Sequence, residues 1–300
     1  MQYGFSIKRK CYLLSVLLMT VWLTGCVQEE FESTPSPAGN GIRFTLTVPD
    51  VNLPSVSSRT MTGTGTAKKE DEIETVDILV FDMSKTPAVF LEWASATEVT
   101  QDLADNSTVS FSAVLSPTTA STCIVVVANK ELDGIVSGFT KGVTTKVRAM
   151  EEMLHTQTGK WLADGSTTGG YTRIPMYGEK VISKITPSMN PITDINMKRM
   201  LARIDIRNNS VTSNFTVEEV YLANYNTTGY IAPAWNTNGQ VTEPAPDTPV
   251  LPTGSGKMTE EGNAILYSVN GNTPYDGEIY TFESLAAGDA GGAGQDGEAS

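Results

Sequence analysis

The sequence predicts an all-β protein with one short helix, organised as β-sandwich domains. The chain contains many short alternating or β-branched segments, turn residues separate them at frequent intervals, and only one segment has helical spacing. Its 300 residues are enough for one to three domains. Sparse charges and abundant Thr, Ser, Gly and Asn are typical of an extracellular β-rich protein. The net charge of -13 and the lack of a basic patch argue against nucleic acid as a partner.

The N-terminus has the pattern of an export signal. Basic residues precede the apolar run 11–23, which is shorter than the about 20 residues of a membrane span and has the length of a signal-peptide core. The run ends in Leu-Thr-Gly-Cys, which resembles the bacterial lipobox. We therefore expect residues 1–25 to be removed and Cys26 to carry lipid that anchors the precursor in the outer membrane. An ordinary signal peptide with a chance cysteine is the alternative.

The chain after the signal begins with a tether and a strand. Residues 27–40 predict a flexible tether, and residues 42–48 alternate strictly, which predicts a half-buried strand. The apolar face of this strand consists of Ile42, Phe44, Leu46 and Val48. Residues 56–66 are rich in Ser, Thr and Gly and contain a single cation, Arg59. Such an exposed loop is a suitable protease substrate.

The middle of the chain supplies most of the predicted strands. The β-branched runs 73–81, 107–115 and 121–130 predict strands, the first of them central. Residues 174–182 predict a hairpin region. Residues 146–156 are the one good helix candidate, because four apolar residues fall on one side at helical spacing: Val147, Met150, Met153 and Leu154.

The last third predicts further strands around a long loop, residues 233–263. Residues 196–208 predict an alternating strand whose apolar face consists of Met200, Ala202, Ile204 and Ile206. Three other segments predict strands: 215–226, 264–270 and 277–284. Low-complexity sequence follows them.

Catalytic and metal-binding patterns are scarce. His155 is the single histidine and cannot build a His-rich metal site, so we expect it on the helix surface or partly packed. Cys123 is the only cysteine left after processing and is expected to be a buried small residue. Asp77 and Asp82 fall on opposite faces of their strand, so edge or solvated positions are expected and not a carboxylate pair. We expect no enzymatic activity, no metal and no cofactor.

Several segments together resemble a known family. The lipobox, the early alternating strand, Ser-Ser-Arg-Thr at 57–60, Ile-Val-Val-Val-Ala-Asn at 124–129 and Met-Leu-Ala-Arg-Ile-Asp-Ile at 200–206 occur in this order. The pattern resembles the type V fimbrillins of the Bacteroidota, the major and minor fimbrial subunit superfamily, over most of residues 1–285. The resemblance implies two tandem transthyretin-like Greek-key β-sandwich domains, of which the second is incomplete in this chain.

The resemblance also implies a role for Arg59. Subunits of this family are secreted as lipoproteins and cut by an Arg-specific protease; here the cut would fall between Arg59 and Thr60. It would release the lipid on Cys26 together with the strand 42–48. The groove left behind would accept a strand from the next subunit, giving a head-to-tail fimbrium at the cell surface. Expected partners are other fimbrial subunits, the protease, the outer membrane through the lipid, and a host protein or glycan.

The expected organisation therefore has five parts. In order, they are the signal peptide 1–25, the lipidated tether and propeptide 26–59 with strand 42–48, the N-terminal β-sandwich domain 60–199, the partial C-terminal β-sandwich domain 200–285, and the low-complexity tail 286–300.

One departure from the family keeps alternatives open. The family's C-terminal domain usually ends with further strands, including an Arg-Asn-x-x-Tyr element and a donor segment, where this chain has Gly/Ala/Asp-rich sequence. A fragment, a diverged C-terminus, or a subunit that accepts a strand without donating one would each account for this. The alternative functions are a tip or anchor accessory subunit, or a non-polymerising surface lipoprotein that binds a glycan or host protein through its loops. A surface hydrolase would need an active site that the sequence lacks.

Overall fold

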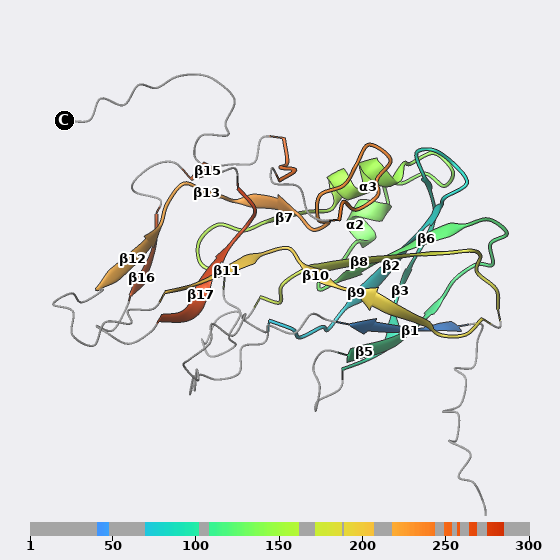
Figure 1. Ribbon diagram of the computed structural model, residues 1–300, viewed down its shortest axis with the longest axis horizontal. Coiled ribbons are helices and arrows are strands. Elements are labelled where there is room, and N and C mark those ends of the chain that lie inside the picture. Colours follow the sequence, from blue (N-terminus) through green and yellow to red (C-terminus); the bar gives the residue numbers. More distant parts are fainter. Residues whose placement is uncertain are drawn as a thin grey trace, which may run out of the picture. The chain divides into compact units, whose positions relative to one another are not determined.

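The protein is described by a computed structural model, whose described residues fall within one compact unit, Asn40–Ser300. They are residues 41–47, 70–101, 108–161, 172–187, 189–206, 218–243, 249–253, 257–258, 264–268 and 275–284. In these ranges strands dominate, and the helices are two short ones, α2 (Asp133–Val136) and α3 (Lys146–Glu152) (Figure 1). The all-β prediction is therefore confirmed. None of the helices in these ranges has the length and apolarity to cross a membrane.

Two sheets form the main layers. Sheet A has the strand order β4 (Thr97–Gln101), β5 (Thr108–Val114), β1 (Gly41–Thr47), β9 (Ile192–Asn196). Sheet B has the order β10 (Lys198–Arg199), β8 (Met176–Ile182), β6 (Thr122–Ala128), β2 (Val76–Asp82), β3 (Val89–Ser95). All neighbouring strands of sheet B are antiparallel.

The inner strands β2 and β6 of sheet B are buried on both faces. Ile78 and Val80 belong to the core that sheet B shares with sheet A, whereas Leu79 and Phe81 pack in a second cluster with Met150 of α3. Successive residues of a strand point to opposite faces, so both must be apolar here. This explains why β2 and β6 are continuous apolar runs while β1, which buries one face, alternates.

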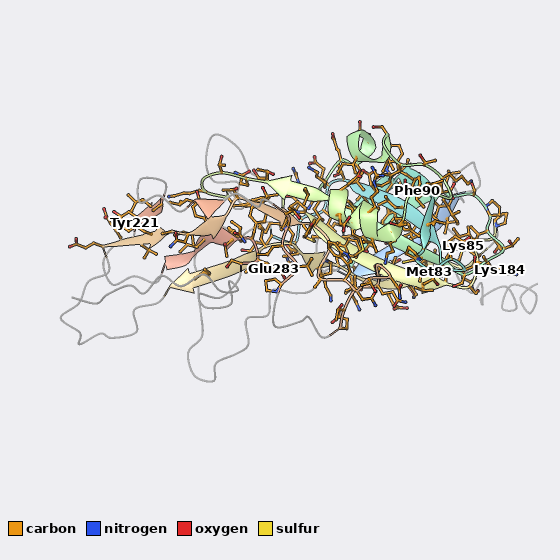
Figure 2. All side chains as sticks on the ribbon, turned by 90° about the horizontal axis from the view of Figure 1, so that it is seen from above. Met83, Lys85, Phe90, Lys184, Tyr221 and Glu283 are labelled. Atoms are coloured by element: carbon orange, nitrogen blue, oxygen red, sulfur yellow. The ribbon has the colours of Figure 1, made fainter. Side chains whose placement is uncertain are left out.

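Four two-stranded antiparallel ladders complete the described chain. They are β7 (Leu154–Thr156) with β14 (Thr228–Tyr230), β11 (Ala202–Ile206) with β17 (Tyr275–Thr281), β12 (Glu219–Leu222) with β16 (Ile265–Ser268), and β13 (Tyr225–Asn226) with β15 (Lys257–Met258). Tyr221, on the β12–β16 ladder, is exposed (Figure 2). Three residues, Tyr225, Ile265 and Ile279, make a small core of their own. The domain boundary near residue 200 stays a prediction.

The helix predicted over 146–156 is too long. It begins as α3, where the Thr145 hydroxyl accepts the Arg148 N–H at 3.2 Å as an N-cap. It ends at Glu152, and the next residues form β7 because they pair with β14, more than 70 residues further along the chain. A partner this distant leaves no signal in the local spacing.

The hairpin predicted over 174–182 is wrong, because this segment is the single strand β8. Gly178 lies inside the strand. A Cβ there would lie 2.7 Å from Met197 Sδ and 2.9 Å from Ile195 Cγ2. Gly178 therefore serves the close approach of the neighbouring segment and not a turn.

The single strand predicted over 196–208 is also wrong. Residues 198–199 form β10 in sheet B and residues 202–206 form β11 in a separate ladder. Met200, between them, is buried, but Ile204 is 40% exposed. The predicted apolar face is therefore divided between two environments.

Candidate functional site

Strand β1 occupies an inner position of sheet A. It pairs with β5 along its whole length, in an antiparallel register that runs from Gly41 opposite Val114 to Thr47 opposite Thr108. Its other edge pairs in parallel with β9. Both edges of its backbone are thus hydrogen-bonded within the sheet, although β1 lies far from both neighbours in the sequence.

The alternation predicted for this strand is present. Ile42, Phe44 and Leu46 are 3%, 1% and 0% exposed. On the opposite face Arg43 and Thr45 are half-buried and Thr47 is exposed. The ring of Phe44 stacks on Phe111 of β5 with 4.9 Å between centroids and 6° between planes. The two rings therefore form a stacked aromatic pair within the buried core.

The surroundings of β1 form a slot lined by apolar side chains, which we name the β1 slot. Its walls come from the two neighbouring strands and its floor from sheet B, all in one buried cluster. The wall residues are Val109, Phe111, Ala113, Ile192 and Ile195, and the floor residues include Ile78, Val80, Ile124 and Val126. A strand that occupies this slot gains two hydrogen-bonded edges and a buried apolar face.

One wall of the slot was missed by the sequence analysis. Strand β9 does not alternate, because Ile192 and Ile195 both reach the core although they are three positions apart, an odd spacing. Asp194 between them has a φ of 58°, and the pairing with β1 shifts register between Phe44 and Leu46. This bulge turns the second isoleucine back to the core face. Because of this bulge, the apolar residues of β9 lack the alternation that reveals a strand in the sequence.

Four of the predicted site residues lie outside the described residues: Cys26, Val48, Arg59 and Thr60. Their roles in lipidation and processing stay predictions. Along the chain, the described part resumes at Glu70, after the segment that contains Arg59.

His155 and Cys123 are packed against neighbouring side chains. His155 lies on β7 and not on a helix, with its ring 5.0 Å from Trp161 and 6.4 Å from Phe282. Burial, assisted by the charge of Lys130, lowers the pKa of His155 to about 4. Cys123 is fully buried in β6, and burial raises the pKa of its thiol to about 12. An inert thiol and a neutral imidazole fit the expectation of packed residues.

The two aspartates of β2 have different environments. Asp77 was expected at an edge or in solvent, but it is 7% exposed; it accepts hydrogen bonds from Ser95 Oγ at 2.7 Å and from the Leu132 N–H at 2.9 Å. Asp82 is half-buried, and its hydrogen bonds with Ser84 lower its pKa. Neither forms a carboxylate pair. Among the described residues, no group of three or more His, Cys, Asp or Glu could hold a metal ion.

A buried ion pair connects α3 to sheet B. Lys146, 1% exposed, donates to Glu179 Oε2 at 2.6 Å, and the Tyr177 hydroxyl donates to the same oxygen at 2.5 Å. Burial, followed by the charge of Glu179, raises the pKa of Tyr177 well above its usual value. Each polar group here has a partner, so the cluster fastens the helix to the sheet.

Comparison with known proteins identifies the family. The chain matches the family model for the major fimbrial subunit protein (FimA) over residues 42–270. A crystal structure of a candidate cell adhesion protein from Parabacteroides distasonis is 15% identical, with 84% of this chain and 73% of that chain covered and a TM-score of 0.47. A fimbrial assembly protein from the same organism is 9% identical, with 81% and 77% covered and a TM-score of 0.39. No protein of curated function matches.

The match begins at the first buried residue of β1 and continues through both sheets, so it covers well over half of the chain. The chain belongs to the major fimbrial subunit protein (FimA) family, which makes it a structural subunit of a cell-surface fimbrium and not an enzyme.

Proposed function

We propose that this subunit assembles by strand exchange at the β1 slot. The precursor carries lipid on Cys26 and is cut by an Arg-specific protease between Arg59 and Thr60. β1 then leaves the slot, and an extended segment of another subunit takes its place. Repeated from subunit to subunit, this contact builds a filament that supports adhesion.

The observation that carries the proposal is the position of β1 in sheet A. It is an inner strand with three buried apolar side chains, and the chain that leaves its C-terminal end leads to Arg59. Burial of Ile42, Phe44 and Leu46 contributes roughly 1.5–3 kcal/mol for each side chain. A slot without a strand would lose this burial and would leave the edges of β5 and β9 unpaired. Such edges bind extended chains.

The same features account for control of assembly. While β1 fills the slot, its backbone pairs with the N–H and C=O groups of β5 and β9, so these groups are not free to bind a strand from a second subunit. A cut after Arg59 separates β1 from β2, which is an inner strand of sheet B and keeps its own pairing with β3 and β6. Sheet B can therefore stay folded when β1 leaves.

The experiment is digestion of the purified chain with an Arg-specific protease, followed by intact mass measurement and size-exclusion chromatography. The expected product starts at Thr60 and forms assemblies larger than the uncut chain. Arg59→Ala should remain uncut and monomeric. Arg148→Ala removes an exposed arginine from α3 and should be cut like the wild type. Normal assemblies from Arg59→Ala would contradict the proposal.

A further inference from the structure

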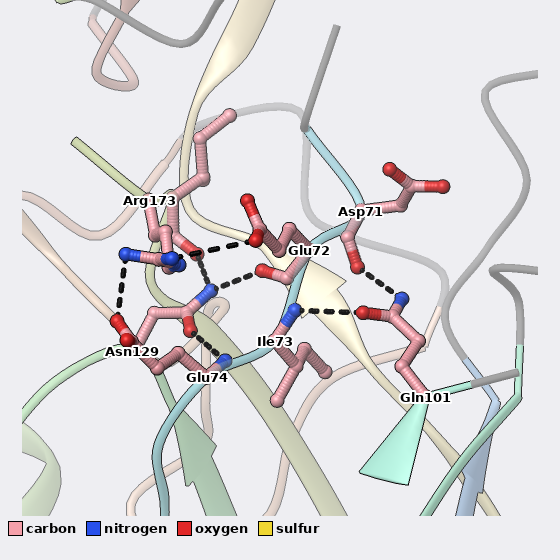
Figure 3. A network of polar contacts seen from close by, with 8 residues as sticks. Asp71, Glu72, Ile73, Glu74, Gln101, Asn129 and Arg173 are labelled. Carbon is pink, nitrogen blue, oxygen red and sulfur yellow. Dashed lines mark hydrogen bonds and ion pairs between the residues drawn. The ribbon is translucent and has the colours of Figure 1, made fainter. Parts of the chain in front are cut away.

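Residues 70–74 are held in place by side-chain amides where a neighbouring strand would otherwise be needed. This segment leads into β2. On one side lies Gln101, at the end of β4 (Figure 3). Gln101 Oε1 accepts the Ile73 N–H at 3.1 Å, and its Nε2 donates to the Asp71 carbonyl at 2.8 Å. One amide thus satisfies one donor and one acceptor of the backbone.

Asn129, directly after β6, makes the same kind of contact on the other side (Figure 3). Its Oδ1 accepts the Glu74 N–H at 3.0 Å, and its Nδ2 donates to the Glu72 carbonyl at 2.8 Å and to the Ile174 carbonyl at 3.0 Å. Asn129 has a φ of 58°, a left-handed conformation that asparagine tolerates better than most residues. We call the two amides and residues 70–74 the amide clamp.

Ion pairs and hydrogen bonds also hold both ends of the segment 70–74. Arg173 pairs with the carboxylates of Glu72 at 3.3 Å and Glu74 at 2.6 Å. At the other end Glu70, 4% exposed, accepts from Arg203 Nη1 at 2.7 Å and from the Tyr280 hydroxyl. The carbonyl of Glu70 also accepts from Arg199 Nε at 2.9 Å. The segment is therefore bound through its backbone and through its carboxylates.

We infer that the amide clamp keeps residues 70–74 and the start of β2 in place independently of strand β1. β1 is held by β5 and β9. Residues 70–74 are held instead by the two amides, on β4 and after β6, and by the charged and hydroxyl groups on or next to β8, β10, β11 and β17. β4 lies in sheet A but pairs with β5 and not with β1. Displacement of β1 removes none of these polar bonds; what the segment loses is apolar packing, because Ile73 lies in the same buried cluster as Ile42, Phe44 and Leu46. The beginning of β2 therefore stays fixed when the chain before it is cut or moved. Strand exchange would use this device, but the clamp itself does not depend on the proposed function.

Hydrogen exchange by mass spectrometry on the uncut, full-length chain tests the clamp. Asn129→Asp and Gln101→Glu keep the side-chain shape and replace the amide donor by a carboxylate oxygen at neutral pH. Exchange over residues 70–75 should rise about fivefold or more, while β1 keeps its protection. Protonation of the new acid at low pH restores a donor, so protection should return toward that of the wild type at the same pH. Asn238→Asp, at an exposed position, is the charge-matched control.

Phe44→Ala supplies the reciprocal measurement. Exchange over residues 41–47 should rise about fivefold more than exchange over residues 70–75, because this change removes packing from β1 directly and no hydrogen bond from residues 70–74. An equal rise over both segments in either experiment would overturn the inference. Unchanged exchange over residues 70–75 in both clamp variants would also overturn it. These experiments need no cleavage, so their failure is separate from a failure of strand exchange, which the Arg59 digestion measures.

Discussion

Replacement of Phe44 by alanine tests whether β1 is part of the folded core. The side chain is 1% exposed and lies face to face with Phe111 across the β1–β5 ladder. Burial this complete places Phe44→Ala in the range of about 3–5 kcal/mol lost from the free energy of unfolding. The slot has little freedom to collapse, because strands on both sides fix the backbone. We expect about 4 kcal/mol, of which the stacked pair supplies about 0.5–1.5 kcal/mol.

The assay is urea unfolding of the uncut chain, followed by intrinsic fluorescence and circular dichroism. With a denaturant slope of about 2 kcal/mol/M, the midpoint should fall by about 2 M. Phe111→Ala and the double variant complete a mutant cycle that isolates the ring contact. Thr47→Ala, on the exposed end of the same strand, should change stability by less than about 0.5 kcal/mol. A loss below about 1 kcal/mol for Phe44→Ala would refute the docking of β1 in solution.

Three further predictions concern groups outside the slot. Lys146→Met should destabilise the fold by about 3–5 kcal/mol because it leaves the Glu179 carboxylate without a counter-ion, and Glu179→Leu in addition should recover part of this loss in urea unfolding, since the buried Tyr177 hydroxyl then lacks its acceptor. With its pKa raised to about 12, Cys123 should resist alkylation at pH 8 until the chain unfolds; fast labelling of Cys123 in the native chain, located by peptide mass, would contradict this. His155 binds its proton less readily when folded, with a pKa of about 4 against 6.5 unfolded. Stability should therefore fall as pH decreases from about 6.5 to 4, and His155→Gln should flatten that slope.

The sequence predicted well those strands in which the order of apolar and polar residues matches the faces that are buried. β1 alternates because one face is buried, and β2 and β6 are continuously apolar because both faces are. Strands β3 and β4 were missed because their residues are mostly half-buried or exposed, which leaves no clear period. Tertiary pairing, and not propensity, determines these edge strands.

The candidate site was only partly accessible from sequence. The buried face of β1 was evident in its alternation, but its neighbours were not, because sheet order is set by non-local contacts and β9 hides its two isoleucines behind a bulge. The amide clamp gave no signal at all. Gln101 and Asn129 acquire their role only when the fold brings them to a segment about 30 and 55 residues away. Asn129 belongs to one of the segments that carried the family resemblance, and the structure supplies a physical use for it.

A reversible lock on β1 tests strand exchange most directly. Thr45 and Ser110 lie opposite each other in the β1–β5 ladder, on the face of sheet A away from the core. Directly opposite Cβ atoms are about 4.5–5.5 Å apart, near the range that a disulfide bridges. The measurement is the size of Thr45→Cys/Ser110→Cys assemblies after Arg59 cleavage, with and without reductant. The account predicts that the reduced chain assembles and that the oxidised chain is cut but remains monomeric. Equal assembly of the oxidised and reduced chains, or assembly of neither, would contradict it.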